Sequence, residues 1–555
     1  MKIKVSEFVV RYLERLGIKH IFGMPGAHIL PVYDALYDSK IEAVLAKHEQ
    51  GAAFMAGGYS RASGEISACI TTAGPGATNL VTGIANAYAD QQPILVITGE
   101  TSTHIFGKGG LQESSGEGGT IDQSALFKGI SKYHKIVERT DYLPQVLNRT
   151  SQILLSPSSG PVVLSFPYNI QQELIDESLL DHIKTDSTNH PLHDSSAAIN
   201  ALADKILAAK HPVIVAGFGC IKGHAQDVVA QLSEQRSIPI ASSLKAKGVI
   251  SEGSPLSLGS LGVTSSGHAY KYIVERADLV IFLGAGFNER TSYLWDDALL
   301  KDKQIIQIDS NPEQLEKVFK ADMAIPGDIH EVISGVLQRI GADNQALDLL
   351  NETSQYIEQL KRSANSDYAI FQSGFSVIEH LFSRIEQHFP EGAVIFDDNI
   401  IFAQNFFKVS SGNRYYPNSG VSSLGHAIPA AIGARFSNQK TTFAILGDGG
   451  FQMCCMEIMT AVNYNRPLNI ILFNNATMGL IRKNQSQQYN QRFINCDFIN
   501  PDFEALSKSF GINYKRVDSN SDIDHVFENS DLTNSINLIE IMIDKDNFPN
   551  YSSRR

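Results

Sequence analysis

Two polar turns near the end of the chain could bind a metal ion together with a diphosphate. Gly447–Gly449 follows the apolar run TTFAIL, Asn474–Asn475 follows NIILF, and twenty-four residues lie between the two turns. Both turns are expected at strand ends of one strand–helix–strand unit, side by side at the carboxyl edge of a parallel sheet. Because neighbouring strands are about 4.8 Å apart, Asp448 and Asn475 could share one small hard cation. The glycines let the backbone approach a phosphate, and a helix from Gly450 offers N–H groups; an ordinary turn is the alternative.

Strands that alternate with helices must position these residues. The pattern predicts three units, residues 1–170, 190–341 and 370–545, joined by polar connections. Each unit is about the size of one domain. The expected fold class is α/β, with three consecutive doubly wound parallel-sheet domains. The most apolar predicted strands are ISACITT, PILVITG and PVVLSFP in the first unit, PVIVAGF, LVIFLGA and QIIQID in the second, and AVIFDD, FAILGDGG, NIILFNN and INLIEIMI in the third.

The composition is typical of a globular protein with an acidic balance. The chain has 555 residues, of which 43% are hydrophobic and 19% charged, and its formal net charge is −13. This charge argues against a general nucleic-acid binder, and no apolar stretch is long enough to predict a membrane span. The five cysteines lack metal-ligand spacing and are interpreted as reduced thiols. A cytoplasmic location is therefore expected.

A glutamate in the first unit opens a helix of small residues. Glu49 precedes a run of glycines and alanines at 51–58. Taken alone, it can be an ordinary carboxylate that interacts with the dipole at a helix N-terminus. The sequence around Glu49 is more specific than a single acid at a helix start. The segment VLAKHEQGAAFMAGGYSRASG is followed by TTAGPGATN at 71–79.

With the two turns, these strings resemble the motifs of the thiamine-diphosphate-dependent enzyme superfamily. The likeness is greatest to the catalytic subunits of acetolactate (acetohydroxyacid) synthases. It covers nearly the whole chain, since FGMPGAHILPVYDAL (22–36), SGVSSLGHAIPAAIGA (419–434) and NPDFEALSKSFG (500–511) also match. The resemblance implies a pyrimidine-binding first domain, a central domain that could bind a nucleotide or FAD, and a diphosphate-binding third domain.

The resemblance also assigns the cofactor site. Glu49 would hydrogen-bond the pyrimidine ring, Leu424 would wedge between the two cofactor rings, and the Ser422 carbonyl would accept from the 4'-amino group. Mg²⁺ would be held by Asp448, Asn475 and the carbonyl of Thr477. Thiamine diphosphate would supply the electron sink. The remaining expected cofactor-binding residues are Pro25, Thr72, Gly76, Asn79, Gly447, Gly449, Gly450, Met478 and Gly479.

Four features bear on the substrate. Arg290, in LGAGFNERTSY, matches an arginine that contacts the carboxylate of the acceptor keto acid, although a solvated surface arginine is the alternative. Gln112 matches a glutamine near the reacting centre, and an exposed loop amide is the alternative. The chain departs from acetolactate synthases at Asn484, where a tryptophan is usual, and in the longer glycine-rich loop 107–120, which is expected to form a flexible flap.

The resemblance leaves a second cofactor open. Asp309 ends a predicted strand at the usual place for an acid that binds a ribose hydroxyl, whereas the first arginine of the flavin-associated segment is Gly286 here. FAD, another nucleotide or no ligand are the possibilities. Active sites at subunit interfaces are implied, in a homodimer or homotetramer.

The expected function is a carboligase of the acetolactate synthase type. It would decarboxylate pyruvate or another 2-keto acid and join the resulting enamine to a second carbonyl acceptor. The alternatives on the same cofactor are a 2-keto acid decarboxylase and a hydrolase that cleaves a carbon–carbon bond in a diketone. The adjacent histidines typical of decarboxylases are absent from the first unit, and intact Glu49, Asp448 and Asn475 argue against a catalytically silent subunit.

Overall fold

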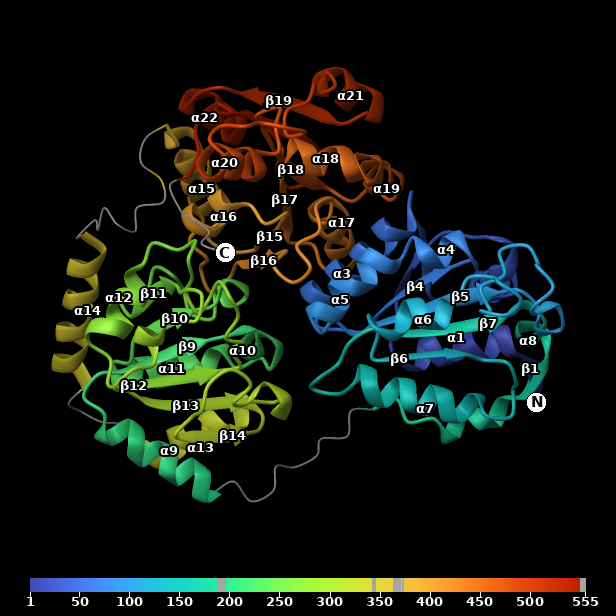
Figure 1. Cartoon of the computed structure of the whole chain (residues 1–555), viewed down its shortest axis with the longest axis horizontal. Coiled ribbons are helices and arrows are strands. Elements are labelled where there is room, and N and C mark those ends of the chain that lie inside the picture. Colours follow the sequence, from blue (N-terminus) through green and yellow to red (C-terminus); the bar gives the residue numbers. More distant parts are fainter. Residues whose placement is uncertain (187–195, 342–345, 363–370, 372–373, 550–555) are drawn as a thin grey trace.

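Three six-stranded parallel sheets follow one another along the chain. The computed structural model describes residues 1–186, 196–341, 346–362, 371 and 374–549. Figure 1 shows three lobes, coloured blue to cyan, green, and orange to red. The predicted α/β class with three doubly wound sheets is confirmed. The predicted beginnings of the second and third units, residues 190 and 370, lie outside the described residues.

The first sheet has the strand order β3-β2-β4-β5-β7-β6. Its strands are β2 (His20–Gly23), β3 (Glu42–Leu45), β4 (Ser67–Thr71), β5 (Ile94–Glu100), β6 (Tyr133–Ile136) and β7 (Val162–Pro167). The helices of this unit are α1 (Val5–Arg15), α2 (Leu30–Tyr37), α3 (Glu49–Ser63), α4 (Pro75–Thr78), α5 (Val81–Ala89), α6 (Gln123–Lys128), α7 (Leu143–Leu154) and α8 (Tyr168–Gln172). A short antiparallel pair, β1 (Lys2–Lys4) and β8 (Leu174–Asp176), joins the two ends of the unit.

The central sheet has the order β11-β10-β9-β12-β13-β14. Its strands are β9 (Pro212–Ala216), β10 (Ile240–Ser242), β11 (Ser257–Ser260), β12 (Leu279–Leu283), β13 (Gln304–Asp309) and β14 (Met323–Pro326). Its helices are α9 (Ser196–Ala208), α10 (Phe218–Lys222), α11 (Gln226–Arg236), α12 (His268–Glu275), α13 (Ile329–Ile340) and α14 (Ala346–Arg362). Helix α14 lies beyond residue 341 and packs Ile357 and Leu360 into the core of the central unit.

The third sheet has the order β16-β15-β17-β18-β20-β19. Its strands are β15 (Ala393–Asp397), β16 (Arg414–Pro417), β17 (Thr441–Gly447), β18 (Leu468–Asn474), β19 (Asn513–Val517) and β20 (Ile536–Met542). Its helices are α15 (Ser376–His388), α16 (Ile401–Phe406), α17 (Ala427–Ser437), α18 (Asp448–Cys454), α19 (Ile458–Asn463), α20 (Gly479–Gln488), α21 (Phe503–Phe510) and α22 (Asn520–Asn529).

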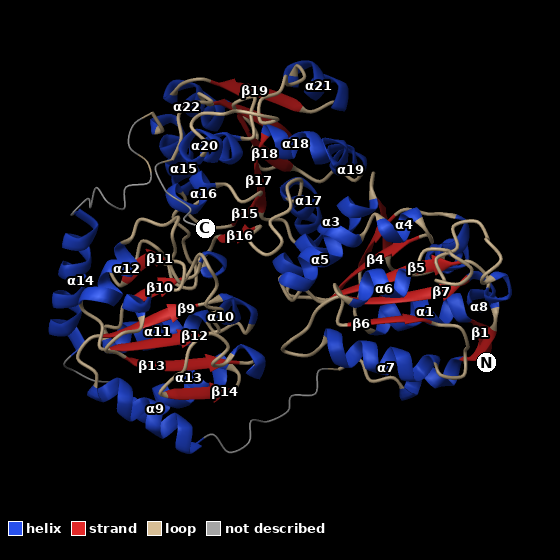
Figure 2. Cartoon of the chain, in the orientation of Figure 1, coloured by secondary structure: helices blue, strands red, loops and turns tan. Residues whose placement is uncertain are grey.

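Helices cover both faces of the sheets (Figure 2). Strand β5 shows why, because Leu95 and Ile97 face one core while Ile94 and Val96 face another. Strands that are apolar on both faces are typical of parallel sheets covered by helices on each side. None of the described helices combines the length and apolar character needed to cross a lipid bilayer.

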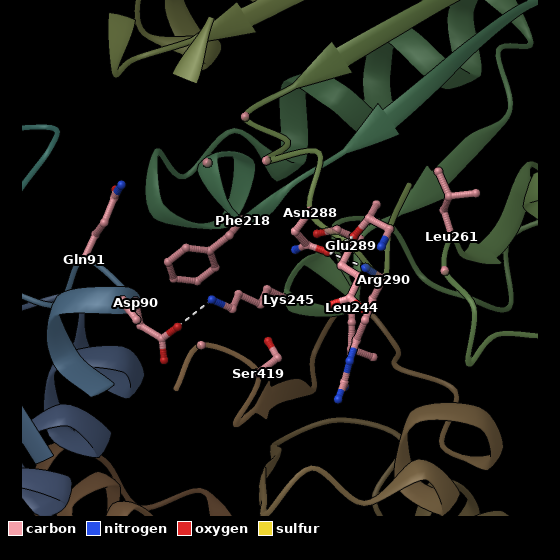
Figure 3. A pocket seen from close by; sticks show the side chains of 18 of the residues that line it. Asp90, Gln91, Phe218, Leu244, Lys245, Leu261, Asn288, Glu289, Arg290 and Ser419 are labelled. Atoms are coloured by element: carbon pink, nitrogen blue, oxygen red, sulfur yellow. Dashed lines mark hydrogen bonds and ion pairs between the residues drawn. The ribbon is translucent and has the colours of Figure 1, made fainter. Parts of the chain in front are cut away.

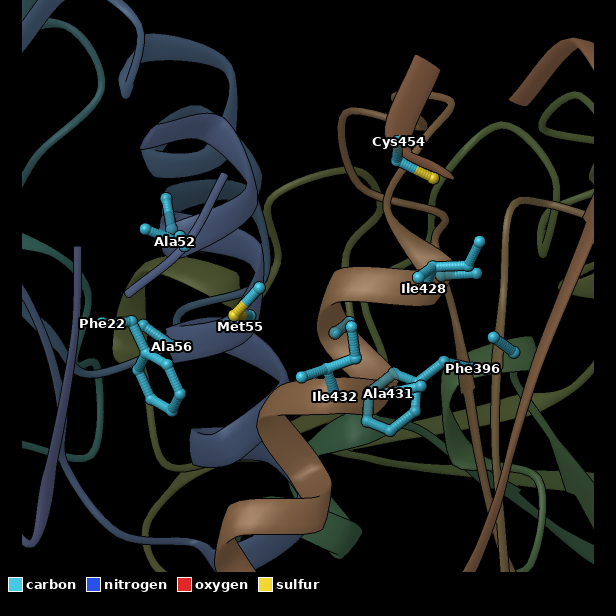
Figure 4. Close-up of a cluster of buried hydrophobic side chains, with 14 of the residues drawn as sticks. Phe22, Ala52, Met55, Ala56, Phe396, Ile428, Ala431, Ile432 and Cys454 are labelled. Carbon is cyan, nitrogen blue, oxygen red and sulfur yellow. The ribbon is translucent and has the colours of Figure 1, made fainter. Parts of the chain in front are cut away.

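One apolar core is shared by the first and third units, where helix α3 crosses helix α17. Figure 4 shows Ala52, Met55 and Ala56 of the blue helix facing Ile428, Ala431 and Ile432 of the brown helix. The approach is close, because a Cβ at Gly433 would overlap the carbonyl oxygen of Met55 and a Cβ at Gly58 would overlap that of Ala430. Small residues on both helices thus fix the position of the first unit against the third.

Candidate active site

The two polar turns of the third unit lie side by side at the carboxyl edge of its sheet. Strands β17 and β18 are parallel neighbours. Oδ2 of Asp448 accepts hydrogen bonds from the backbone N–H groups of Asn475, at 3.2 Å, and Ala476, at 2.6 Å. Helix α18 begins at Asp448, two residues before Gly450, the start expected from the sequence. The carboxylate is thus at the junction of the two turns.

Asp448 is a buried carboxylate surrounded by neutral groups. Its side chain is 1% exposed, and burial raises its pKa above the ordinary value, against the lowering effect of hydrogen bonds from Asn500 and backbone amides. No group of three or more His, Cys, Asp or Glu suited to a metal occurs among the described residues. The donors at this edge are oxygen atoms of the Asp448 carboxylate, the Asn475 amide and the Thr477 carbonyl, and such a set would suit Mg²⁺.

A later segment of the chain holds the second turn in place. Thr477 donates from Oγ1 to the carbonyl of Cys496 at 2.9 Å, and the N–H of Met478 donates to the same carbonyl at 2.7 Å. Asn500 donates from Nδ2 to Oδ2 of Asp448 and to Oδ1 of Asn474, both at 2.8 Å. The sequence motif NPDFEALSKSFG marked this region, but sequence reasoning gave Asn500 no role.

Glycines allow the two turns to meet. A Cβ at Gly449 would lie 2.6 Å from Sδ of Met478, and a Cβ at Gly479 would lie 2.9 Å from Nδ2 of Asn475. A side chain at either position would therefore push the first turn away from the second. The predicted residues 447–450 and 475–479 form one compact cradle.

A second buried aspartate, which sequence reasoning missed, holds the turn that carries Ser422 and Leu424. Asp398 follows β15 and accepts backbone hydrogen bonds from Gly425 at 2.7 Å, His426 at 3.0 Å and Ala427 at 2.7 Å. Burial raises the pKa of Asp398 to about 7. The only available signal was its place at the end of AVIFDD, a strand that pairs directly with β17.

The backbone around this turn is tightly constrained. Ser422 has φ +58°, a left-handed conformation that is uncommon for a residue other than glycine. A Cβ at Gly450 would lie 2.7 Å from Oδ2 of Asp398. The carboxylate of Asp398 thus joins the turn bearing the half-buried Leu424 to the first turn of α18.

The predicted residues of the first unit gather at the carboxyl edge of its own sheet. Glu49 begins α3, and its Oε2 accepts a hydrogen bond from Nδ2 of Asn79 at 2.9 Å. The turn after β2, with Pro25, approaches the turn after β4 so closely that a Cβ at Gly26 would lie 2.5 Å from Cβ of Thr72. Gly76 is packed in the same way, because a Cβ there would overlap Oγ1 of Thr71.

The glycine-rich loop brings Gln112 to the same edge. Oε1 of Gln112 lies 3.1 Å from Nδ1 of His28 and accepts from Oγ1 of Thr72 at 3.3 Å. The loop is folded around carboxylates, because Glu113 accepts from the N–H groups of Gly107 at 2.6 Å and Gly110 at 2.8 Å. Gln112 is therefore placed by a set of defined hydrogen bonds.

A buried glutamate holds the base of this loop. Oε1 of Glu100 accepts from the N–H groups of Thr101 at 2.8 Å and Ser114 at 3.0 Å. Oε2 of Glu100 is buried and has no hydrogen-bond partner among the described residues. Burial raises the pKa of Glu100 to about 6. The loop therefore rests on a carboxyl group that is easily protonated.

Arg290 lies in a cleft between the units. Nη1 donates to Oδ1 of Asn399 at 2.7 Å, and the cleft, of about 660 Å³, is also lined by Ser422 and Asp309. Figure 3 shows Arg290 of the central unit beside Ser419 of the third, and it marks the ion pair between Asp90 and Lys245 at the other side of the cleft. The central and third units thus both contribute to this cavity.

Comparison with known proteins gives a consistent result over the three units. Residues 3–125 match the model described as thiamine pyrophosphate enzyme, N-terminal TPP binding domain. Residues 199–336 match the central domain, and residues 399–541 match the C-terminal TPP binding domain. The chain belongs to the thiamine pyrophosphate enzyme family. The protein is thus an enzyme that depends on thiamine pyrophosphate, the cofactor also called thiamine diphosphate.

Relatives of this thiamine pyrophosphate enzyme match over nearly its whole length. A "Probable acetolactate synthase large subunit" of Methanocaldococcus jannaschii is 32% identical over 98% of this chain and 92% of its own. An "Acetolactate synthase" of Mycobacterium bovis is 30% identical over 97% of this chain and 87% of its own. An "Acetolactate synthase large subunit" of Lactococcus lactis subsp. lactis is 30% identical over 97% and 92%. The predicted resemblance to acetolactate synthase catalytic subunits is confirmed.

The residues of the third unit fit the diphosphate end of this cofactor. The buried Asp448 carboxylate has neutral neighbours, so its ionised form is destabilised by burial. A divalent cation bound there would compensate the negative charge. The cradle at 447–450 and 475–479 leaves no room for side chains at Gly449 and Gly479. A ligand bound there would therefore contact backbone atoms at these two positions.

Within one chain of this thiamine pyrophosphate enzyme, the Glu49 group and the Asp448 group remain separate. No hydrogen bond joins the two groups in the part of the chain that the structure describes. Glu49 begins α3 beside Glu457, which accepts from the N–H groups of Lys47 at 3.1 Å and His48 at 2.9 Å. Glu457 follows the end of α18, whose seven residues rise about 10 Å from Asp448.

Proposed function

We propose that this enzyme is a Mg²⁺-dependent carboligase of the acetolactate synthase type. It would decarboxylate pyruvate or another 2-keto acid and join the remaining fragment to a second carbonyl compound. Bound thiamine diphosphate supplies the electron sink for decarboxylation and for carbon–carbon bond formation. The observation that carries the proposal is the nearly full-length similarity to relatives named acetolactate synthase. It is supported by Arg290 of the central unit, which lines the same cleft as Ser422.

The chain's own residues have separate tasks in this proposal. Glu49, held by Asn79, would hydrogen-bond the pyrimidine ring, and Leu424 would hold the two rings of the cofactor in a bent conformation. Asp448, Asn475 and the Thr477 carbonyl would bind Mg²⁺. The Ser422 carbonyl, positioned by the left-handed backbone conformation, would accept a hydrogen bond from the 4'-amino group of the pyrimidine.

Arg290 supports a keto acid as the acceptor. Its hydrogen-bond partner Asn399 is a neutral amide, so the guanidinium can still pair with an anionic ligand. It lines the same cleft as Ser422, which belongs to the proposed cofactor turn. A guanidinium can bind a carboxylate through two parallel hydrogen bonds, and it would orient the acceptor's carbonyl relative to the cofactor.

We propose that the working enzyme is a homodimer or homotetramer with active sites between subunits. Asp448 begins α18, whereas the backbone next to Glu49 hydrogen-bonds Glu457, which follows the end of that helix. A second copy can supply the missing group, as the Glu49 of one chain meets the cradle of the other. Sedimentation with and without thiamine diphosphate and Mg²⁺ tests this assembly.

The cleft also suits a nucleotide, of which FAD is one. Its volume of about 660 Å³ is in the range of small-molecule sites, and Asp309 and Lys222 line it. Asp309 ends β13, and burial raises its pKa. A flavin absorbance spectrum in the purified protein would support FAD, and a nucleotide released on denaturation without flavin absorbance would replace it.

The deciding experiment is proton NMR of the protein with pyruvate, Mg²⁺ and thiamine diphosphate, beside a Glu49→Gln variant. Acetolactate formed only by the intact enzyme supports the carboligase. Acetaldehyde as the main product would instead identify a 2-keto acid decarboxylase. Unchanged pyruvate would direct the search to other donors, including diketones for a carbon–carbon hydrolase.

A further inference from the structure

A histidine without a role in the proposed site lies at the same sheet edge as Glu49. His28 belongs to the turn after β2, and its carbonyl oxygen accepts a hydrogen bond from Nε2 of Gln171 at 2.6 Å. Gly99 of β5 packs against this carbonyl so closely that a Cβ would overlap it. The backbone of His28 is therefore held from two sides, so the ring is attached to a fixed backbone position.

The ring itself is oriented by Gln112. Nδ1 of His28 lies 3.1 Å from Oε1 of Gln112, and the same oxygen accepts from Thr72. An amide oxygen only accepts, so Nδ1 carries the hydrogen and Nε2 is the nitrogen that can take up and release a further proton. No hydrogen bond to Nε2 is present among the described residues. Nε2 is therefore available to transfer a proton.

The ring lies among the residues that face the cofactor's pyrimidine end in the proposed site. Strand β2 lies between β3 and β4 in the sheet, and these two strands lead to Glu49 and Asn79. The hydrogen bond between Glu49 and Asn79 therefore spans the end of β2, from which the His28 turn projects. Glu100 lies beneath the loop, where its Oε1 accepts from two backbone N–H groups and its Oε2 is buried away from solvent.

Carbon–carbon bond formation creates a need for such a group. When the donor carbon bonds to the acceptor's carbonyl carbon, the C=O π electrons move onto oxygen, and that oxygen becomes a hydroxyl by gaining one proton. We propose that His28 delivers this proton from Nε2, having taken it from solvent, and that Gln112 positions the ring. The inference rests on the proposed carboligase function, and it makes His28 the proton-transfer residue for the acceptor.

The test compares His28→Ala with His104→Ala, an exposed histidine of the same loop region. In His28→Ala, ligation of pyruvate is expected to fall about 100-fold, as for loss of a general acid. Thiamine diphosphate affinity by calorimetry and hydrogen–deuterium exchange of the thiazolium proton by NMR are expected to remain within about twofold, because Glu49 is unaffected. Added imidazole is expected to restore part of the ligation rate, and His104→Ala is expected to match the wild type.

Other outcomes overturn the proposal. Ligation within about twofold of the wild type shows that His28 transfers no proton. A parallel loss of cofactor affinity and thiazolium exchange, without recovery in imidazole, shows a structural role. His28→Gln, of similar length, replaces the alanine variant if that protein does not fold, and the same loss of ligation is expected. A wild type that releases CO₂ but forms no ligation product refutes the proposed function itself, and the two failures are thus distinguishable.

Discussion

Asn79 fixes the side chain of Glu49 by donating a hydrogen bond to Oε2 at 2.9 Å. In the proposed mechanism the other oxygen, Oε1, remains for the pyrimidine ring. This hydrogen bond joins the start of α3 to the segment after β4. The orientation of the Glu49 carboxylate therefore depends on a residue thirty positions later in the chain.

Replacing Asn79 by alanine is expected to reduce turnover more than cofactor binding. The freed carboxylate can rotate away, and a loss of about tenfold in kcat corresponds to ~1.4 kcal/mol. Thiazolium proton exchange measured by NMR should fall with kcat. Thr78→Ala, which removes only a local bond to the Pro75 carbonyl, is the control and should leave both unchanged. Equal kcat in the two variants would contradict the assigned role of Asn79.

Replacing Asp398 by alanine is expected to destabilise the third unit and weaken thiamine diphosphate binding. Three buried N–H groups at the start of α17 would lose their acceptor, at a cost of about 1–3 kcal/mol for an unsatisfied group. The matched control is Asp502→Ala, which removes the single-bond N-cap of α21 at a cost of about 1 kcal/mol. Calorimetry should show reduced cofactor affinity only for Asp398→Ala. An unchanged affinity would mean that the Leu424 turn holds its shape without this carboxylate.

Thermal stability is expected to depend on pH through Glu100. Its pKa is raised from 4.5 to about 6, so the folded protein holds this proton more tightly than the unfolded chain. The resulting stabilisation is present below about pH 4.5 and is lost as the pH rises through about 6. Relative to Glu100→Gln, the wild type should therefore lose about 2 kcal/mol between these limits. Melting temperatures of both proteins across this range check the prediction, and a constant difference would refute it.

Replacing Gly433 by alanine is expected to separate helices α3 and α17. The new Cβ would overlap the Met55 carbonyl oxygen, and overpacking of this kind costs about 1–3 kcal/mol. Gly129→Ala is the control, because a Cβ there meets nothing within 4 Å and the backbone has φ −86°. Differential scanning calorimetry should show a lower melting temperature for Gly433→Ala alone. If both variants melt like the wild type, the crossing is more adaptable than the distances indicate.

Sequence reasoning reached the parts of the site that follow from strand ends and local motifs. The meeting of Asp448 with the Asn475 turn was predictable, because two apolar strands in one strand–helix–strand unit place their following residues at one edge. Asn500 and Asp398 were given no role, because their hydrogen bonds to Asp448 and to the turn at 425–427 join parts of the chain that are distant in sequence. The hydrogen bond between His28 and Gln112 joins turns eighty-four positions apart, which periodicity does not reveal. The same limit applies to the crossing of α3 and α17, which depends on the matching shapes of two small-residue surfaces.

The crossing of α3 and α17 joins two parts of the chain that are made at different times. The N-terminal unit leaves the ribosome with the alanine and glycine face of α3 complete, whereas α17 is made only after roughly 360 further residues, or on the order of 20–70 s at typical translation rates. During that interval Ala52, Met55 and Ala56 lack their contacts with α17. Small residues expose little apolar area, so the nascent chain presents a weakly adhesive surface during this wait. The glycines and alanines that permit close helix contact in the finished enzyme thus also limit aggregation before its last third exists.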